Sequence, residues 1–178
     1  MAPVRSVLFN KTLETTMPTN FAVSVDTAAT LMDISKRTLW RHLADGQYSP
    51  QPKDPQGRTV LLLSEVAPKF SIELLPGDGN PDTDDYALLA LADQGDANCQ
   101  ADFAVLLLEQ EKPGLAAHWF ALAAEKEHPD AMHHLSVLYQ TGQGVKRSEE
   151  PAMVWRSRAA AAGHKIARAQ LDDMKVWG

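Results

Sequence analysis

Several features are scarce in this sequence, and each shortage excludes a class of protein. Cys99 is the only cysteine among 178 residues, which excludes a disulfide-based scaffold. No apolar run approaches the roughly 18 residues of a membrane-spanning helix. The first residues also lack the apolar core and cleavage site of a secretory signal. We therefore expect a cytoplasmic location without membrane contact.

The charge of the chain is distributed unevenly between its two halves. Hydrophobic side chains make up 44% of the sequence and charged ones 22%, too apolar a composition for a disordered chain. Residues 1–75 carry eight Lys and Arg against seven Asp and Glu, a net charge of +1. Residues 76–178 carry nine against sixteen, a net charge of −7. This asymmetry indicates two units with different tasks.

A segment rich in helix breakers separates the two halves. The sequence PGDGNPDTDD at 76–85 combines Pro, Gly, Asn and Asp, and its last aspartates are suited to capping a following helix. We place a boundary at about residue 78. The expected organisation is an N-terminal arm at 1–20, a small domain at 21–77 and a second domain at 78–178.

The second domain contains an internal repeat. Trp119 matches Trp155 and His128 matches His164, both 36 residues apart. A period of this length is typical of stacked helix pairs. The fold class we predict is mainly α, with an α-solenoid as the larger part. The helices are expected at 83–94, 97–110, 114–126, 130–141, 149–162 and 165–176.

Two segments of this domain resemble the Sel-one-like repeat, a solenoid relative of the tetratricopeptide repeat. They are ALAAEKEHPDAMHHLSVLYQTGQGV and PAMVWRSRAAAAGHKIARAQL, with an Ala-Ala-x-x-Gly-His junction at 159–164 and a Gly-x-Gly-Val loop at 142–145. Glu127 departs from the pattern, where glycine is usual. The resemblance implies a module without catalysis of its own that binds a partner protein. A homodimer formed through the repeats is a further possibility.

The first domain has the pattern of two short helices around a tight turn. In SVDTAATLMDISKRTLWRHLADGQ, Ser24 or Asp26 is suited to cap the first helix and Ser35 the second, which Gly46 ends. A strand, a turn at 54–57 and a second strand are expected to follow, before a helix that opens at Ser64.

This domain resembles the winged helix-turn-helix of the MerR and phage-excisionase families. The matching positions are Ala28-Ala29, Ile34-Ser35, Thr38-Leu39, Gly46 and Arg58. The resemblance implies that the second helix enters the major groove of double-stranded DNA, with the wing beside it. The predicted DNA-binding residues are Ser35, Lys36, Arg37, Thr38, Arg41 and His42 from the helix and Arg58 from the wing.

Two functions remain open from the sequence. The first is a bacterial DNA-binding transcriptional regulator whose repeats bind a protein or dimerise. The second is a non-enzymatic adaptor in which the helix-turn-helix docks protein rather than DNA. The second is favoured by the low net charge of residues 1–75 and by Trp40, which is expected at an exposed position of the second helix.

No residue pattern predicts catalysis, a cofactor or a metal ion. His128 and His164 occupy equivalent repeat positions, and His133 and His134 point in different directions on a helix, so neither pair indicates a metal site. Cys99 lies at a small-residue position of the repeat and is expected to be a buried thiol. We therefore expect a protein that is not an enzyme.

Overall fold

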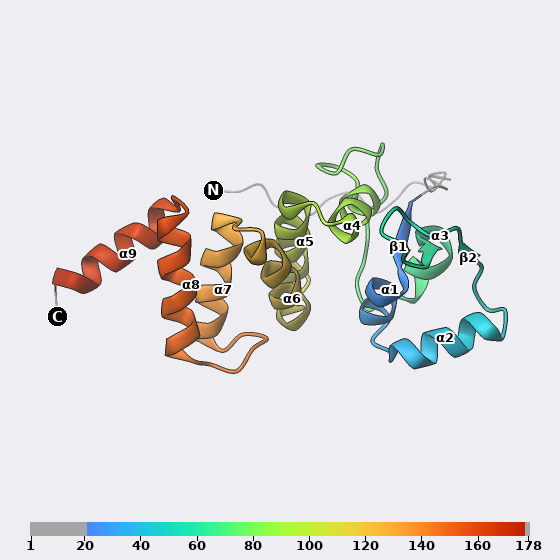
Figure 1. Ribbon diagram of the computed structural model, residues 1–178, viewed down its shortest axis with the longest axis horizontal. Helices are drawn as coiled ribbons and strands as arrows, with labels where there is room; N and C mark the ends of the chain where they lie inside the picture. The colour runs from blue at the N-terminus through green and yellow to red at the C-terminus, as the bar shows by residue number, and fades with distance from the viewer. Residues whose placement is uncertain (1–20, 177–178) are drawn as a thin grey trace, which may run out of the picture.

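The computed structural model describes the backbone of residues 21–176 and the side chains of residues 21–173. The predicted N-terminal arm, residues 1–20, lies outside the described residues. The described chain is mainly helical and elongated, with a small mixed unit at one end and a row of stacked helices extending from it (Figure 1).

The small unit contains a three-stranded antiparallel sheet and short helices. The sheet order is β1-β3-β2, and Val23 pairs with Leu61 while Gln51 pairs with Val60. Ser24 rather than Asp26 caps the first helix, because its hydroxyl accepts a hydrogen bond from Thr27 N. The elements are β1 (Ala22–Ser24), α1 (Val25–Leu31), α2 (Lys36–Ala44), β2 (Pro50–Gln51), β3 (Val60–Leu62), α3 (Leu63–Val66) and the 3₁₀ turn η1 (Ala67–Lys69).

The core of this unit lies between the sheet and the two longer helices. Leu39 is the fully buried side chain of α2, and it packs with others from β1, α1 and β3. The outer face of α2 is exposed, since no other element among residues 21–176 packs over it. The fully buried aliphatic side chains are Val23, Leu31, Leu39, Leu61, Leu63 and Val66.

The second unit is a row of six helices that follow one another along the chain (Figure 1). Each predicted helix is present, with ends within two residues of the predicted ones. Neighbours in sequence are neighbours in space, and α5 with α6 and α7 with α8 form the most extensive contacts. The elements are α4 (Asp85–Gln94), α5 (Ala97–Glu109), α6 (Pro113–Glu125), α7 (Pro129–Thr141), α8 (Glu149–Ala161) and α9 (Lys165–Val176).

The two histidines at equivalent positions of the repeat cap the helices that follow them. Nδ1 of His128 accepts a hydrogen bond from Ala131 N at the start of α7, at 3.3 Å. Nδ1 of His164 accepts one from Ala167 N at the start of α9, at 3.1 Å. Each histidine therefore satisfies an amide that the first helical turn leaves without an internal partner.

Candidate functional site

The predicted DNA-binding residues of α2 lie on one short helix, but several already have partners within the protein. Ser35 caps the helix by accepting a hydrogen bond from Thr38 N at 3.0 Å, and the two hydroxyls lie 2.8 Å apart. Lys36 forms an exposed ion pair with Asp26, with 2.5 Å between Nζ and Oδ1. His42 is half-buried, with its ring 6.4 Å from that of Tyr48.

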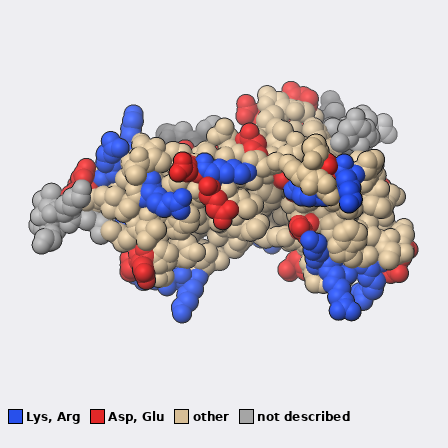
Figure 2. Space-filling model, viewed as in Figure 1, with Lys and Arg blue, Asp and Glu red and all other residues tan. Residues whose placement is uncertain are grey.

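The outer face of α2 presents two cations beside an aromatic ring. Arg37 and Arg41 are exposed one helical turn apart, and neither has an ion-pair partner among residues 21–173. Trp40, between them in the sequence, has 44% of its surface exposed, as the sequence predicts. Figure 2 shows basic side chains projecting from the end of the molecule that carries α2. We call Arg37, Trp40 and Arg41 the α2 face.

Arg58, the residue predicted to contact DNA from the wing, is directed into the protein instead. Its Nε donates a hydrogen bond to Oδ2 of Asp54 at 2.6 Å, and its Nη2 donates to Oδ2 of Asp93 at 3.0 Å. Nη1 donates to the backbone oxygen of Asp93 at 3.0 Å. All three guanidinium nitrogens donate within the protein, and the side chain is 33% exposed, so any phosphate contact of Arg58 stays a prediction.

The electrostatics of this pair confirm a tight contact. Burial raises the pKa of the Asp54 carboxyl, but the hydrogen bonds and positive charge of Arg58 outweigh it and hold that pKa below its usual value. Arg58 therefore forms ion pairs with two carboxylates, one from its own turn and one from α4.

Asp93 joins the two units. Its side chain is 3% exposed and accepts hydrogen bonds from Ser24 N at 3.0 Å and Ser24 Oγ at 2.7 Å, as well as from the Thr27 hydroxyl. With Arg58, four donors from the small unit reach this one carboxylate on α4. Buried apolar side chains of both units belong to one continuous cluster. The sequence gives no hint of Asp93, because its partners lie 35 to 69 residues away.

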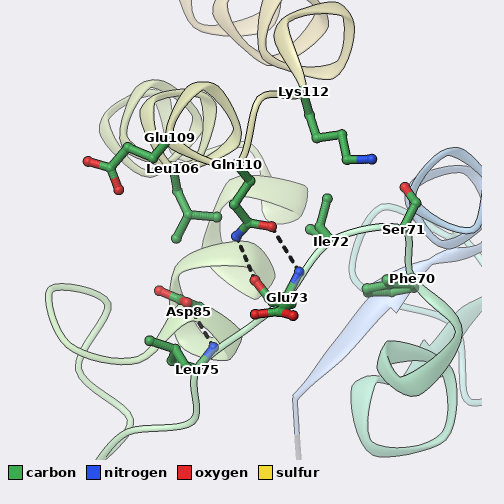
Figure 3. Close-up of a pocket in the computed structure, with 10 residues that line it drawn as sticks. All are labelled: Phe70, Ser71, Ile72, Glu73, Leu75, Asp85, Leu106, Glu109, Gln110 and Lys112. Atoms are coloured by element: carbon green, nitrogen blue, oxygen red, sulfur yellow. Dashed lines mark hydrogen bonds between the residues drawn. The ribbon is translucent and has the colours of Figure 1, made fainter. Parts of the chain in front are cut away.

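A groove lies where the two units meet (Figure 3). It has a volume of about 580 Å³ and is bounded by the extended segment 70–75, by α4 and by the end of α5. Its lining residues are Phe70, Ser71, Ile72, Glu73, Leu75, Asp85, Leu106, Glu109, Gln110 and Lys112.

Hydrogen bonds from the repeat helices fix the extended wall of this groove. The amide of Gln110 accepts from Glu73 N at 2.8 Å and donates to Glu73 O at 2.7 Å. Leu75 N donates to Oδ2 of Asp85 at 2.8 Å, and Asp85 N donates to Leu75 O at 3.0 Å. Figure 3 shows both attachments. The wall is therefore held in place without a ligand.

A second hollow of about 370 Å³ continues the groove across α4 and α5. The two share Asp85, Leu106 and Glu109, and we refer to them together as the junction groove. The second hollow is lined by Pro81, Asp82, Asp85, Leu88, Asp102, Val105, Leu106 and Glu109. Figure 2 shows acidic side chains gathered over the loop before α4, at this part of the molecule.

The junction groove combines an apolar floor with an acidic rim. Leu75 is 57% exposed and Val105 is 37% exposed, so aliphatic surface is accessible there. Lys112 is the single cation among the lining residues. The acidic lining residues are Glu73, Asp82, Asp85, Asp102 and Glu109.

The pKa of Asp102 is raised, chiefly by burial. Burial raises its pKa, and the charges of Asp82, Asp96 and Asp130 raise it further, while His128 lowers it. A carboxyl group in this setting gains from a nearby positive charge.

Two features that could support chemistry are a metal-ligand cluster and a reactive thiol, and the described residues supply neither. Among residues 21–173, no three or more His, Cys, Asp or Glu side chains are placed to hold a metal ion together. Cys99 is buried, as predicted, and burial followed by the charge of Asp96 raises its pKa to about 11, so the thiol is protonated at neutral pH. No helix within the described part of the chain is long and apolar enough to cross a membrane.

Comparison with known proteins agrees with the repeat architecture. Residues 108–128 and 129–164 match the Sel1 repeat, which confirms the predicted resemblance for α6, α7 and α8. A Sel1 repeat protein from Oxalobacter formigenes, known from its crystal structure, is 26% identical with a TM-score of 0.45. The match covers 48% of this chain and 37% of that one. No curated protein sequence matches the chain.

The fold and the matched segment together define a class. The chain carries a helical repeat in which each helix contacts its neighbours along the chain. Within that class, residues 108–164 are Sel1 repeats. The junction groove adjoins them and includes their first residues, because Glu109, Gln110 and Lys112 line it.

Proposed function

We propose that this protein is a non-enzymatic adaptor whose repeat domain binds a partner protein. The observation that carries the proposal is the match of residues 108–164 to the Sel1 repeat. A stack of helix pairs presents an extended surface, which suits recognition of another chain better than enclosure of a small substrate. The open, polar-rimmed hollows of the junction groove are consistent with this task.

In this proposal the chain has two domains, 21–77 and 78–178, that act as one body. Asp93 ties them together through Ser24, Thr27 and Arg58. The first domain is a helix-turn-helix with a small wing, used for docking, and its α2 face offers Trp40 between two arginines. Tryptophan and arginine are enriched among the residues that dominate protein interfaces. The two domains would then present two binding surfaces at a fixed separation.

Photo-crosslinking in cells that naturally produce the protein tests the adaptor function. A photoreactive amino acid is placed at Val105 in the junction groove or at Trp40 on α2, in the full-length chain. We expect crosslinked protein adducts that survive nuclease treatment. Adducts that vanish with nuclease, or no adducts from either position, would contradict the proposal.

The second candidate is a DNA-binding transcriptional regulator. It is favoured by the exposed Arg37 and Arg41 on the helix that resembles the recognition helix of MerR and excisionase proteins. Its weakness is the small number of available cations, because Lys36 and Arg58 are paired with carboxylates. Affinity for DNA grows with each phosphate that a protein neutralises.

A gel-shift experiment with genomic fragments separates the two candidates. A regulator would shift particular fragments, and the Arg37→Ala/Arg41→Ala variant would not. Its binding to DNA would weaken steeply with added salt. An adaptor would retain none at physiological salt. A matched control is Arg147→Ala, which removes an exposed cation that pairs with Glu149 outside the small unit.

A further inference from the structure

We infer that the junction groove binds a segment of a partner protein that carries Lys or Arg next to aliphatic side chains. The inference rests on the proposed adaptor function and names the chemistry of its partner. The proposed binding site is the junction groove, where α4 and α5 meet the segment 70–75.

Charge complementarity indicates which sign of charge the bound segment of the partner carries. Five carboxylates line the groove against Lys112 alone. Asp82 and Asp102 both line the second hollow, and the charge of Asp82 adds to the effect of burial in raising the pKa of Asp102. A cationic segment would relieve that repulsion, whereas a nucleic acid or a phosphorylated peptide would add to it.

The floor of the groove selects aliphatic side chains beside the cations. Leu75 and Val105 expose much of their surface, and Leu88 and Leu106 continue the apolar strip below them. A purely polar cationic peptide would leave this strip in water. A peptide that alternates cations with aliphatic residues would cover the strip and reach the rim at the same time.

The walls are held in place before any ligand arrives. Both backbone groups of Glu73 are bonded to the Gln110 amide, and both of Leu75 to Asp85. A groove fixed in this way loses little conformational entropy on binding. The attachment also lets α5 and the small unit contribute to one surface, so neither domain alone contains the complete groove.

The test uses the full-length protein and a fluorescein-labelled peptide built from repeated Lys-Leu-Ser triplets, followed by fluorescence anisotropy. Two further peptides, built from Glu-Leu-Ser and from Lys-Ser-Ser triplets, examine the sign of the charge and the need for the aliphatic residue. We expect binding of the first peptide, about tenfold weaker binding of the third and none of the second.

Two pairs of variants locate the peptide. Asp102→Asn/Glu109→Gln neutralises the rim, and its control Glu125→Gln/Glu150→Gln removes the same charge from exposed positions outside the groove. Val105→Ser alters the floor, and its control is Val154→Ser, a 52% exposed valine on α8. We expect each groove variant to weaken binding about tenfold and each control to leave it unchanged. All six substituted positions are exposed, and circular dichroism verifies that the variants fold.

Equal affinity of groove and control variants would overturn the inference, as would equal binding of the Glu-Leu-Ser peptide. Self-association that the rim variant abolishes would overturn it too, because the occupant would then be a second copy of this chain. These results leave the adaptor function standing if crosslinked proteins are still found. Absence of crosslinked proteins would contradict the adaptor function itself.

Discussion

Arg58 and Asp93 join the two units of the chain through two hydrogen bonds of 3.0 Å, one to the carboxylate and one to the backbone oxygen. The contact is part-buried, and the carboxylate also accepts from Ser24 and Thr27. The turn that carries Arg58 is therefore part of a domain junction. This placement explains why a residue that fits a DNA-binding wing in the sequence has its guanidinium group bound to two carboxylates of the protein.

Loss of Asp93 should destabilise the whole protein. Asp93→Ala removes the carboxylate that accepts from three side chains of the small unit, and leaves Arg58 with Asp54 and the backbone oxygen of residue 93. We expect the free energy of unfolding to fall by about 2–4 kcal/mol, measured by urea denaturation. The control Asp26→Ala breaks only the exposed pair with Lys36 and should cost less than about 1 kcal/mol. Equal losses of unfolding free energy in the two variants would show that the contacts of Asp93 stabilise the protein no more than an exposed ion pair does.

The loop between α7 and α8 should tolerate no side chain at Gly144. Its φ is +71°, and a Cβ there would lie 2.3 Å from the carbonyl carbon of Pro113. Gly144→Ala should therefore cost about 2–4 kcal/mol, from left-handed strain and from displacement of the start of α6. Gly163→Ala is the matched control, because its φ is +97° but nothing lies within 4 Å. It should cost about 1–2 kcal/mol in thermal or urea unfolding. The reverse order would contradict this packing.

His133 should make the stability of the repeats sensitive to mild acid. Burial and the charges of His164, His134 and Arg156 lower its pKa from 6.5 to about 4, and its ring stacks on His164 at 4.2 Å. The unfolded chain takes up this proton near pH 6.5 and the folded chain only near pH 4. Stability is therefore complete above about pH 6.5 and is lost progressively as the pH falls toward 4, by about 1–3 kcal/mol.

The His133→Phe variant tests that dependence, because phenylalanine keeps a ring at this position and does not titrate. Its unfolding free energy should change less between pH 7 and pH 4 than that of the wild type. His118→Gln removes an exposed histidine and should leave the profile unaltered. An unchanged profile in His133→Phe would assign the dependence to other groups.

Cys99 should be inert in the folded protein. Because burial raises its pKa to about 11, the thiolate is scarce at pH 8. We expect alkylation by iodoacetamide to be at least about a hundredfold slower than in urea-unfolded protein, followed by mass spectrometry. Comparable rates in the two states would show that the start of α5 opens readily.

The helices of the repeat could be predicted because their information is local. The 36-residue period and the capping positions before each helix determine their ends, and all six were located within two residues. His128 and His164 also illustrate the limit of the pattern. Their equivalence was evident, but their task as caps required the positions of the amides that they accept from.

The candidate site could not be predicted in the same way, because it is made by contacts between distant residues. Gln110 reaches Glu73 across 37 positions, and Arg58 reaches Asp93 across 35. Nothing in the residue types marks Gln110 as the support of a groove. The predicted basic helix is present, but its pairing of Lys36 with Asp26 also depends on the fold.

The central proposal for this protein is the binding of a partner protein where the small unit meets the Sel1 repeats. Its most direct test is a ¹H–¹⁵N NMR titration of the full-length protein with the Lys-Leu-Ser peptide. We predict amide shifts concentrated in residues 72–75, 85–88 and 102–112, with α2 unaffected. Shifts concentrated in α2, or none at saturating peptide, would contradict the account.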